Sequence, residues 1–209
     1  LERETMDWKL GLTQSVFKQS KYAEAVALTE ELIKKYPDRA DFWLLQGNAY
    51  IGLGKPLEAA ENFELVQRMG EATPRSLKLL GDIYVNREMW DLATRAYGLA
   101  VAAKPDQPMS RPLQWVKILA QRGAFPQAQR LLNEVKDVYG DALDDADRKE
   151  LLKLEARLAL NEGEGGEAVE VLEQIVDMDP LDGEALMLLG QHYAGDGDVG
   201  RAALYYERA

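Results

Sequence analysis

Few side chains in this 209-residue sequence could carry out chemistry. The chain contains no cysteine, which excludes a disulfide framework, a thiolate zinc site and a cysteine nucleophile. Its single histidine, His192, excludes a histidine metal cluster, and its place beside Gly190 and Tyr193 is more typical of packing than of ligation. No Walker phosphate loop, Gly-x-Gly-x-x-Gly or His-Glu-x-x-His motif occurs. We therefore expect no catalytic residue, no metal ion and no cofactor.

Acidic side chains cluster in residues 140–147, which read Gly-Asp-Ala-Leu-Asp-Asp-Ala-Asp. One interpretation is a calcium-binding loop, but an EF-hand needs a fixed Asp spacing, a central glycine and a glutamate at its twelfth position, and these are missing. We favour the start of a helix, with Asp144 or Asp145 as N-cap and the other carboxylates stabilised by the helix dipole. The similar Asp196-Gly197-Asp198 falls at an expected turn between helices.

Acidic residues outnumber basic ones by 36 to 25, which gives a net charge of −11 at pH 7. We expect no nucleic-acid partner, because neutralisation of phosphates dominates that affinity. Residues 140–209 hold 6 basic and 18 acidic side chains, whereas residues 1–139 hold 19 and 18. This bias indicates a solvated acidic face in the last third of the chain, with a contact to a partner or to a second copy as the alternative.

Apolar residues make up 46% of the chain and charged residues 29%, as in a soluble, folded protein. No apolar run reaches 18 residues, so we expect no insertion into a membrane. Lack of cysteine fits an oxidising compartment and is also common in bacterial cytoplasmic proteins, which leaves cytoplasm and periplasm open. Because the chain begins at Leu1 and ends at Ala209 without a helix-ending residue, we expect a piece of a longer protein or a mature form without its leader.

A repeat of about 34 residues runs through the whole sequence. An alanine recurs at intervals of 34, 34, 35, 40 and 34 residues, at Ala25, Ala59, Ala93, Ala128, Ala168 and Ala202. A glycine or another small or short residue precedes each alanine by twelve positions, at Thr13, Gly47, Gly81, Val116, Ala156 and Gly190. Chance does not keep such markers in phase over six units.

These markers resemble the tetratricopeptide repeat (TPR), whose pattern runs Trp, Leu-Gly, Tyr, Ala, Phe, Ala, Pro over 34 residues. The second unit matches best, with Trp43, Gly47, Tyr50, Gly54, Ala59 and Phe63. Thr13, Val116 and Ala156 depart from the pattern where glycine is expected. The resemblance implies an all-α, right-handed superhelical solenoid of stacked antiparallel helix pairs. We expect one solenoid over residues 1–209, with units at about 6–39, 40–73, 74–108, 109–148, 149–182 and 183–209.

The physical chemistry of the units predicts the same helix pairs. Gly47 lacks a side chain, so a second helix can approach closely there, and Ala59 is the small residue expected opposite. Thr73-Pro74 is typical of an N-cap followed by a first-turn proline. Four glycines are expected at left-handed turns between the helices of a unit, namely Gly54, Gly123, Gly163 and Gly197. Three prolines are expected to end second helices, namely Pro37, Pro105 and Pro180.

In the TPR arrangement the first helix of each unit lines a concave groove. Helical spacing places twelve residues on that face: Gln14, Leu44, Asn48, Arg75, Lys78, Asp82, Asn86, Leu113, Lys117, Gln121, Lys153 and Arg157. Five of them are cationic, which favours a partner segment that is acidic or carries a C-terminal carboxylate. The alternative is that these charges are paired across helices and contact no ligand.

We therefore expect a non-catalytic scaffold that binds a peptide or protein segment in the groove. Two other classes stay open on the sequence alone, and an RNA-binding helical repeat is a weaker alternative, because the acidic pI of about 4.7 opposes it. One is a structural module that self-associates through its last helix or its acidic units. The other is the partner-recruiting domain of a larger enzyme or of a secretion or assembly machine.

Overall fold

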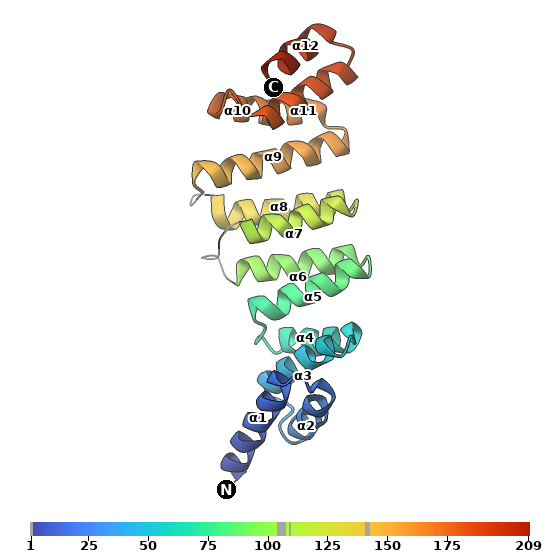
Figure 1. Ribbon diagram of the computed structural model, residues 1–209, viewed down its shortest axis with the longest axis vertical. Helices are drawn as coiled ribbons and strands as arrows, with labels where there is room; N and C mark the ends of the chain where they lie inside the picture. Colours follow the sequence, from blue (N-terminus) through green and yellow to red (C-terminus); the bar gives the residue numbers. More distant parts are fainter. Residues whose placement is uncertain (1, 104–107, 109, 141–142) are drawn as a thin grey trace. The chain divides into compact units, whose positions relative to one another are not determined.

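The computed structural model describes residues 2–103, 108, 110–140 and 143–209 (Figure 1). These residues form α-helices and contain no strand. The helices are α1 (Glu2–Lys18), α2 (Tyr22–Lys35), α3 (Ala40–Gly52), α4 (Pro56–Arg68), α5 (Pro74–Asn86), α6 (Trp90–Ala102), α7 (Ser110–Gln121), α8 (Phe125–Tyr139), α9 (Asp145–Glu162), α10 (Gly165–Met178), α11 (Gly183–Gly195) and α12 (Val199–Arg208). The predicted all-α fold of paired helices is confirmed.

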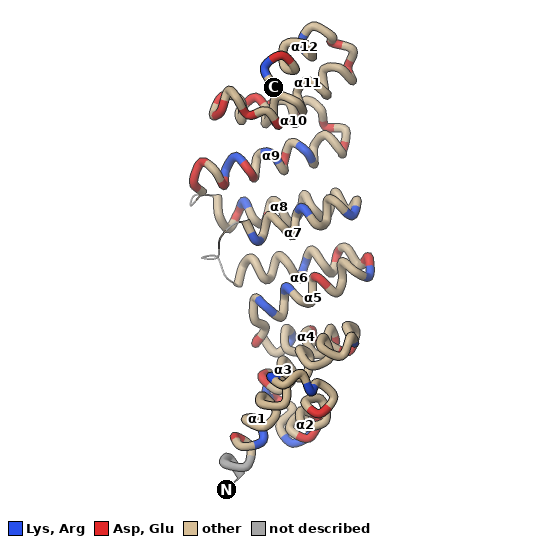
Figure 2. The backbone as a smooth tube through the Cα atoms, viewed as in Figure 1, with Lys and Arg blue, Asp and Glu red and all other residues tan. Residues whose placement is uncertain are grey.

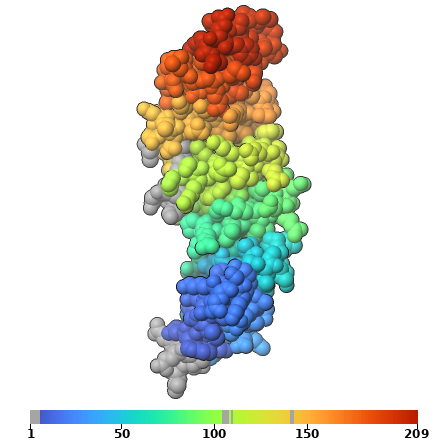
Figure 3. All heavy atoms as spheres, in the orientation of Figure 1, coloured from blue at the N-terminus to red at the C-terminus, as the bar shows by residue number. Residues whose placement is uncertain are grey.

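Contacts divide the chain into two compact units, Leu1–Lys104 and Pro105–Ala209. The first unit contains α1 to α6 and the second α7 to α12, and in both each helix packs against its neighbours in sequence. In the space-filling view, segments that follow one another in the sequence lie against one another within each unit (Figure 3). Each unit buries its own row of apolar residues, as a stack of helix pairs requires.

A glycine on the first helix of three pairs lies directly against an aromatic ring of the second helix. A Cβ atom added to Gly47 would approach the Phe63 ring to 2.6 Å, and one added to Gly81 would approach the Tyr97 ring to 2.4 Å. Gly190 faces Tyr206 in the same way. The close approach predicted at Gly47 is thus present, but the ring of Phe63, one turn beyond Ala59, occupies the space.

The aromatic residue follows its glycine by sixteen positions in all three pairs. The same two positions can be compared in the pairs that lack this glycine. In those pairs the two positions hold Thr13 and Thr29, Val116 and Leu132, and Ala156 and Leu172. All six side chains are fully buried. A larger residue on the first helix is therefore matched by a smaller one on the second, which is how a close-packed interior keeps its volume.

Each pair turns through a residue in the left-handed region. The four predicted glycines have positive φ angles, 69° at Gly54, 78° at Gly123 and Gly197, and 84° at Gly163. The equivalent residues in the first and third pairs are Ser20 at 60° and Glu88 at 58°, which the sequence did not reveal. The turn geometry is therefore imposed by the packing of the pair, even on residues for which it is unfavourable.

The predicted helix ends are also present. The Thr73 hydroxyl accepts a hydrogen bond from the Ser76 amide at 3.1 Å, and the Ser76 hydroxyl accepts one from the Thr73 amide at 3.0 Å. Asp144 caps α9 by accepting the Asp147 amide at 2.8 Å, which makes the acidic segment a helix start. Pro37 and Pro180 follow the ends of α2 and α10. Residues 105, 109, 141 and 142 lie outside the described residues.

Replacing Glu88 by glycine is expected to stabilise the protein by about 0.5–1 kcal/mol. The change removes the steric cost of a left-handed residue with a Cβ, about 1–2 kcal/mol, and this gain is partly offset by the greater chain entropy of unfolded glycine. Urea unfolding followed by circular dichroism measures the difference. Gly54→Ala is the matched control: an added Cβ there meets no atom within 4 Å, so its expected loss of stability comes from the backbone alone. A Glu88→Gly variant less stable than the parent would contradict this account.

Candidate functional site

A hollow between α7, α8 and α9 brings together three of the predicted groove residues, Lys117, Gln121 and Arg157. Its volume is about 320 Å³. The remaining lining residues are Ala120, Phe125, Leu154, Leu158 and Asn161. The hollow therefore combines apolar side chains with two amides and two cations.

Burial divides the lining of this hollow into a floor and a rim. Leu154 and Leu158 are almost completely buried and form the apolar floor, whereas Gln121, Arg157 and Asn161 are exposed. The amide nitrogen of Asn161 donates to the Arg157 carbonyl one turn earlier at 2.8 Å, which leaves its side-chain oxygen as an acceptor. Such an arrangement can receive an apolar side chain and hydrogen-bond an extended backbone beside it.

The two cations of the rim are each paired with a glutamate on the next first helix. Lys117 on α7 lies 3.2 Å from a carboxylate oxygen of Glu150 on α9, and Arg157 on α9 pairs with Glu184 on α11. Figure 2 shows the blue and red positions alternating along α9. In both pairs the cation is the ninth residue of a predicted unit and the glutamate the second residue of the following unit. The contact is thus a repeated feature of how first helices stack.

Lys153 belongs to an ion-pair network rather than to an open surface. Its side chain is only 12% exposed and lies 2.8 Å from Asp182, whose own side chain is 5% exposed. Asp182 also contacts Lys149 at 3.2 Å and caps α11 by accepting the Ala185 amide at 3.1 Å. Lys149 reaches Asp179 at 2.8 Å as well. This network ties α9 to the start of α11.

The network stabilises the charged forms of its members, so it raises the pKa of the lysines and lowers the pKa of the aspartates. Burial alone would raise the pKa of Asp182, but hydrogen bonds from Lys153, the Ala185 amide and Lys149 hold it below its usual value. The pKa of Asp179 is lowered chiefly by Lys149. Burial would lower the pKa of Lys153, yet the hydrogen bonds to Asp182 and Glu184 raise it.

Leu113 is the remaining predicted groove residue of the compact unit Pro105–Ala209. It is 3% exposed, so its side chain belongs to the core and is not accessible to a ligand. The accessible part of the predicted surface in this unit is therefore the rim around Lys117, Gln121 and Arg157.

The predicted groove residues of the compact unit Leu1–Lys104 also divide into paired or half-buried residues and exposed ones. Lys78 pairs with Asp82 one turn later, and the other oxygen of Asp82 accepts the Tyr97 hydroxyl at 2.8 Å. Burial and the nearby Asp82 raise the pKa of Tyr97. Asn48 donates to the Leu44 carbonyl at 2.7 Å, and both side chains are half-buried. The exposed residues of the predicted set here, besides Lys78, are Gln14, Arg75 and Asn86.

His192 packs as its sequence context indicates. Its imidazole covers Gly165 and lies edge-on to the Tyr193 ring, and its Nε2 atom is 3.3 Å from a carboxylate oxygen of Asp196. Among the described residues, no group of three or more His, Asp or Glu side chains is arranged to hold a metal ion. In the same residues, no helix has the length and apolar character needed to cross a membrane.

Sequence reasoning left open that the groove cations are paired across helices. Its twelve groove residues did not include the carboxylates that pair with Lys117, Lys153 and Arg157, nor Phe125 and Asn161 in the hollow. Glu150, Glu184 and Asp182 carried a usable signal, because each lies at or beside the start of the unit that follows its partner. Phe125 opens the second helix of its pair, so the helical spacing of first helices could not place it.

A family model described as tetratricopeptide repeat matches residues 10–74, 44–108 and 153–209, well over half of the chain. The chain belongs to the tetratricopeptide repeat family. TPR proteins generally mediate protein–protein or peptide binding, and their repeats are usually non-catalytic. The matches omit residues 109–152, which include the whole predicted repeat 109–148, where Val116 replaces the expected glycine. No curated protein sequence matches the chain significantly.

Solved structures show the same fold. YrrB, described as a TPR protein with an unusual peptide-binding site, is 20% identical, with 85% of this chain and 88% of that chain covered and a TM-score of 0.55. The C-terminal part of a TPR protein from Cytophaga hutchinsonii is 19% identical, covering 94% and 76%, with a TM-score of 0.56. A chain of Naa15/Naa10 bound to HypK is 16% identical, covering 97% and 31%, with a TM-score of 0.64.

Asp182→Ala is expected to lower the free energy of unfolding by about 3 kcal/mol, because it removes an N-cap and breaks a buried ion pair. Asp182→Asn keeps the cap and is expected to cost less. Urea unfolding at pH 7 compares both variants with the parent. An Asp182→Ala variant as stable as the parent would show that the network contributes nothing.

The depressed pKa values of Asp179 and Asp182 predict a pH dependence. Their stabilising contribution is complete above the ordinary aspartate pKa of 3.8 and is lost as the pH falls through the lower folded-state values. The acid limb of the stability curve should therefore be shallower in Asp182→Asn than in the parent. Identical acid limbs would contradict the assignment of this pH dependence to Asp182.

Proposed function

We propose that this TPR chain is a non-catalytic scaffold that binds an extended segment of a protein partner at the hollow between α7, α8 and α9. The observation that carries the proposal is the combination, in one hollow, of a buried apolar floor with a rim of two amides and two cations, of which Lys117 is half-buried and the others are exposed. Ligand sites share this division between apolar surface for affinity and a few polar groups for orientation.

The floor and the amides determine how the segment lies. An apolar side chain of the partner contacts Leu154, Leu158 and Phe125. Its backbone hydrogen-bonds to Gln121 and to the free oxygen of Asn161. Amide side chains suit this role because each offers both donors and acceptors, as the peptide backbone does.

The rim cations select an acidic or carboxylate-terminated segment. A carboxylate of the partner exchanges for Glu150 at Lys117, or for Glu184 at Arg157. Because one ion pair replaces another on an exposed surface, each exchange changes affinity little, by about 0.2–1 kcal/mol. The charges therefore set register and encounter rate, while the floor supplies most of the affinity.

Filling the hollow is expected to abolish binding. Peptides selected from a random display library on the parent protein are titrated by fluorescence anisotropy against Ala120→Trp. Because the indole occupies the hollow, affinity should fall at least tenfold. Ala194→Trp is the control, since it places the same side chain at an exposed position of α11 in the same unit. Equal binding by the parent and Ala120→Trp would place the binding surface elsewhere.

Releasing one cation tests the charge selection. In Glu150→Gln, Lys117 loses its carboxylate partner, so peptides with an acidic residue should bind up to about fivefold more tightly. Their neutral amide analogues should not gain. An equal gain for both peptides would contradict selection by charge.

Self-association is the alternative favoured by one observation, the exposed Val199, Leu204 and Tyr206 on α12. Sedimentation velocity of the protein alone distinguishes the two functions. The scaffold proposal predicts a mass independent of concentration, and a mass that rises with concentration would favour the structural module instead.

A further inference from the structure

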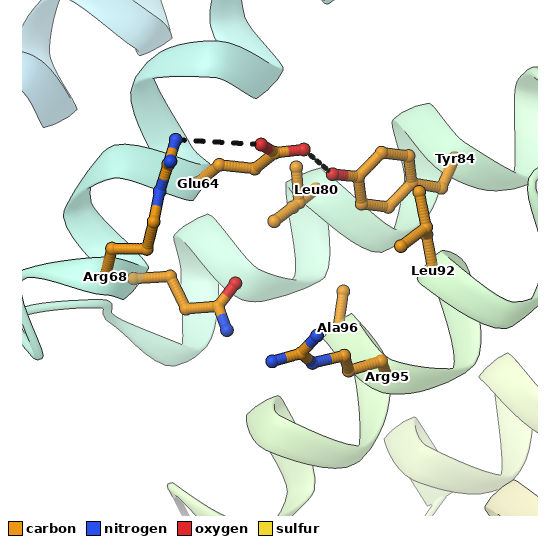
Figure 4. A pocket seen from close by; sticks show the side chains of 8 residues that line it. Glu64, Arg68, Leu80, Tyr84, Leu92, Arg95 and Ala96 are labelled. Atoms are coloured by element: carbon orange, nitrogen blue, oxygen red, sulfur yellow. Dashed lines mark hydrogen bonds and ion pairs between the residues drawn. The ribbon is translucent and has the colours of Figure 1, made fainter.

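A second hollow lies in the compact unit Leu1–Lys104, between α4 and α6 and over α5 (Figure 4). Its volume is about 260 Å³, which accommodates one or two side chains rather than a larger ligand. Its lining residues are Glu64, Gln67, Arg68, Leu80, Tyr84, Leu92, Arg95 and Ala96. None of them was among the predicted groove residues, and only Leu80 and Tyr84 lie on a first helix of a pair.

The carboxylate of Glu64 is already engaged on one side of this hollow. One of its oxygens accepts the Tyr84 hydroxyl, and the other lies 4.0 Å from a guanidinium nitrogen of Arg68. Burial, together with this hydrogen bond to Glu64, raises the pKa of Tyr84, so the hydroxyl stays a donor at neutral pH. The negative charge of Glu64 is therefore satisfied within its own wall of the hollow.

Arg95 on the opposite wall has no such partner. It makes no hydrogen bond or ion pair with any residue that the structure describes, and its side chain is exposed. In Figure 4 the guanidinium extends from α6 into the hollow, with no dashed line to the residues drawn. Guanidinium groups bind carboxylates through two parallel hydrogen bonds, which makes this the most strongly directional unused group of the hollow.

Apolar surface lies next to Arg95. Leu80 and Ala96 are buried beneath the hollow, and Leu92 is 39% exposed at its edge. The lining carries two guanidinium groups and one carboxylate, so its net charge is positive in a chain whose overall charge is −11. A ligand that matches this lining is anionic at one end and apolar at the other.

We propose that this hollow is a second binding site, which takes a carboxylate and a neighbouring apolar side chain from an acidic segment of a protein partner. Arg95 binds the carboxylate, and the apolar side chain packs on Leu80 and Leu92. The site is independent of the hollow between α7 and α9, because it lies in the other unit and uses other helices. One chain can thus hold two separate segments.

The test uses the full chain and a small defined ligand, the blocked dipeptide acetyl-Leu-Glu-amide, followed by NMR. The expected result is a saturable shift of the Arg95 side-chain Nε–H signal and of the Leu92 methyl signals. The neutral analogue acetyl-Leu-Gln-amide should bind at least tenfold more weakly. Acetate alone should also bind at least tenfold more weakly, because it lacks the apolar group.

Two variants make the result specific. Arg95→Gln should lose the saturable shift at Leu92, with an unchanged circular dichroism spectrum. Arg87→Gln is the control, since it removes an exposed arginine of the same unit outside the hollow, and it should bind as the parent does. Failure of this pattern would leave the α7–α9 proposal untouched, because neither variant alters that unit.

Three results would overturn the proposal. Equal shifts with the two dipeptides would exclude recognition of the carboxylate, and equal affinity for acetate would exclude the apolar part. Unlabelled protein can also be added to the labelled protein. If it produced the same shifts at a lower concentration than the dipeptide does, the occupant would be a second copy of the chain instead of a partner.

Discussion

The distance between the two helices of a pair depends on the residues at two positions, one on the first helix and one sixteen residues later, which are in direct contact in the three pairs with a glycine and an aromatic ring. Where the first is glycine, an aromatic ring fills the space, and where it is larger, the second residue is smaller. In the other three pairs both positions are fully buried, so the same compensation of volumes applies there although the sequences differ. The left-handed turn follows from it, because the chain must reverse within a short turn to bring both residues together.

Much of the fold could be predicted because its signals are local or periodic. The recurrence of small residues fixes the repeat, and glycine, proline, threonine and aspartate mark turns and caps through their own backbone preferences. Ser20 and Glu88 could not be recognised as left-handed, because tertiary packing overrides what their residue types favour. The same holds for Phe63, since Ala59 and Phe63 share a helix face and only the packed pair decides which one meets Gly47.

The candidate site was predictable in position but not in charge. Helical spacing predicted that Lys117, Gln121 and Arg157 share one surface, and they line one hollow, but it left open whether the two cations are available or paired across helices. Their glutamate partners lie 33 and 27 residues away, and the varying unit length hides that common relation until helices are stacked. Neutralised cations select a ligand by exchange and contribute little net affinity, so the apolar floor has the larger part in binding.

A double-mutant cycle at Gly47 and Phe63 tests the packing constraint most directly. Gly47→Ala should destabilise the protein by about 1–3 kcal/mol through overpacking, although alanine is the better helix former. Gly11→Ala, whose added Cβ meets no atom within 4 Å, should instead stabilise it by about 0.5–1 kcal/mol. Combining Gly47→Ala with Phe63→Leu recreates the pairing of Ala156 with Leu172. Because the two residues are in contact, the double variant should lose less unfolding free energy than the summed losses of the two single variants, by about 1 kcal/mol or more. Losses that add within about 0.5 kcal/mol would contradict the packing constraint.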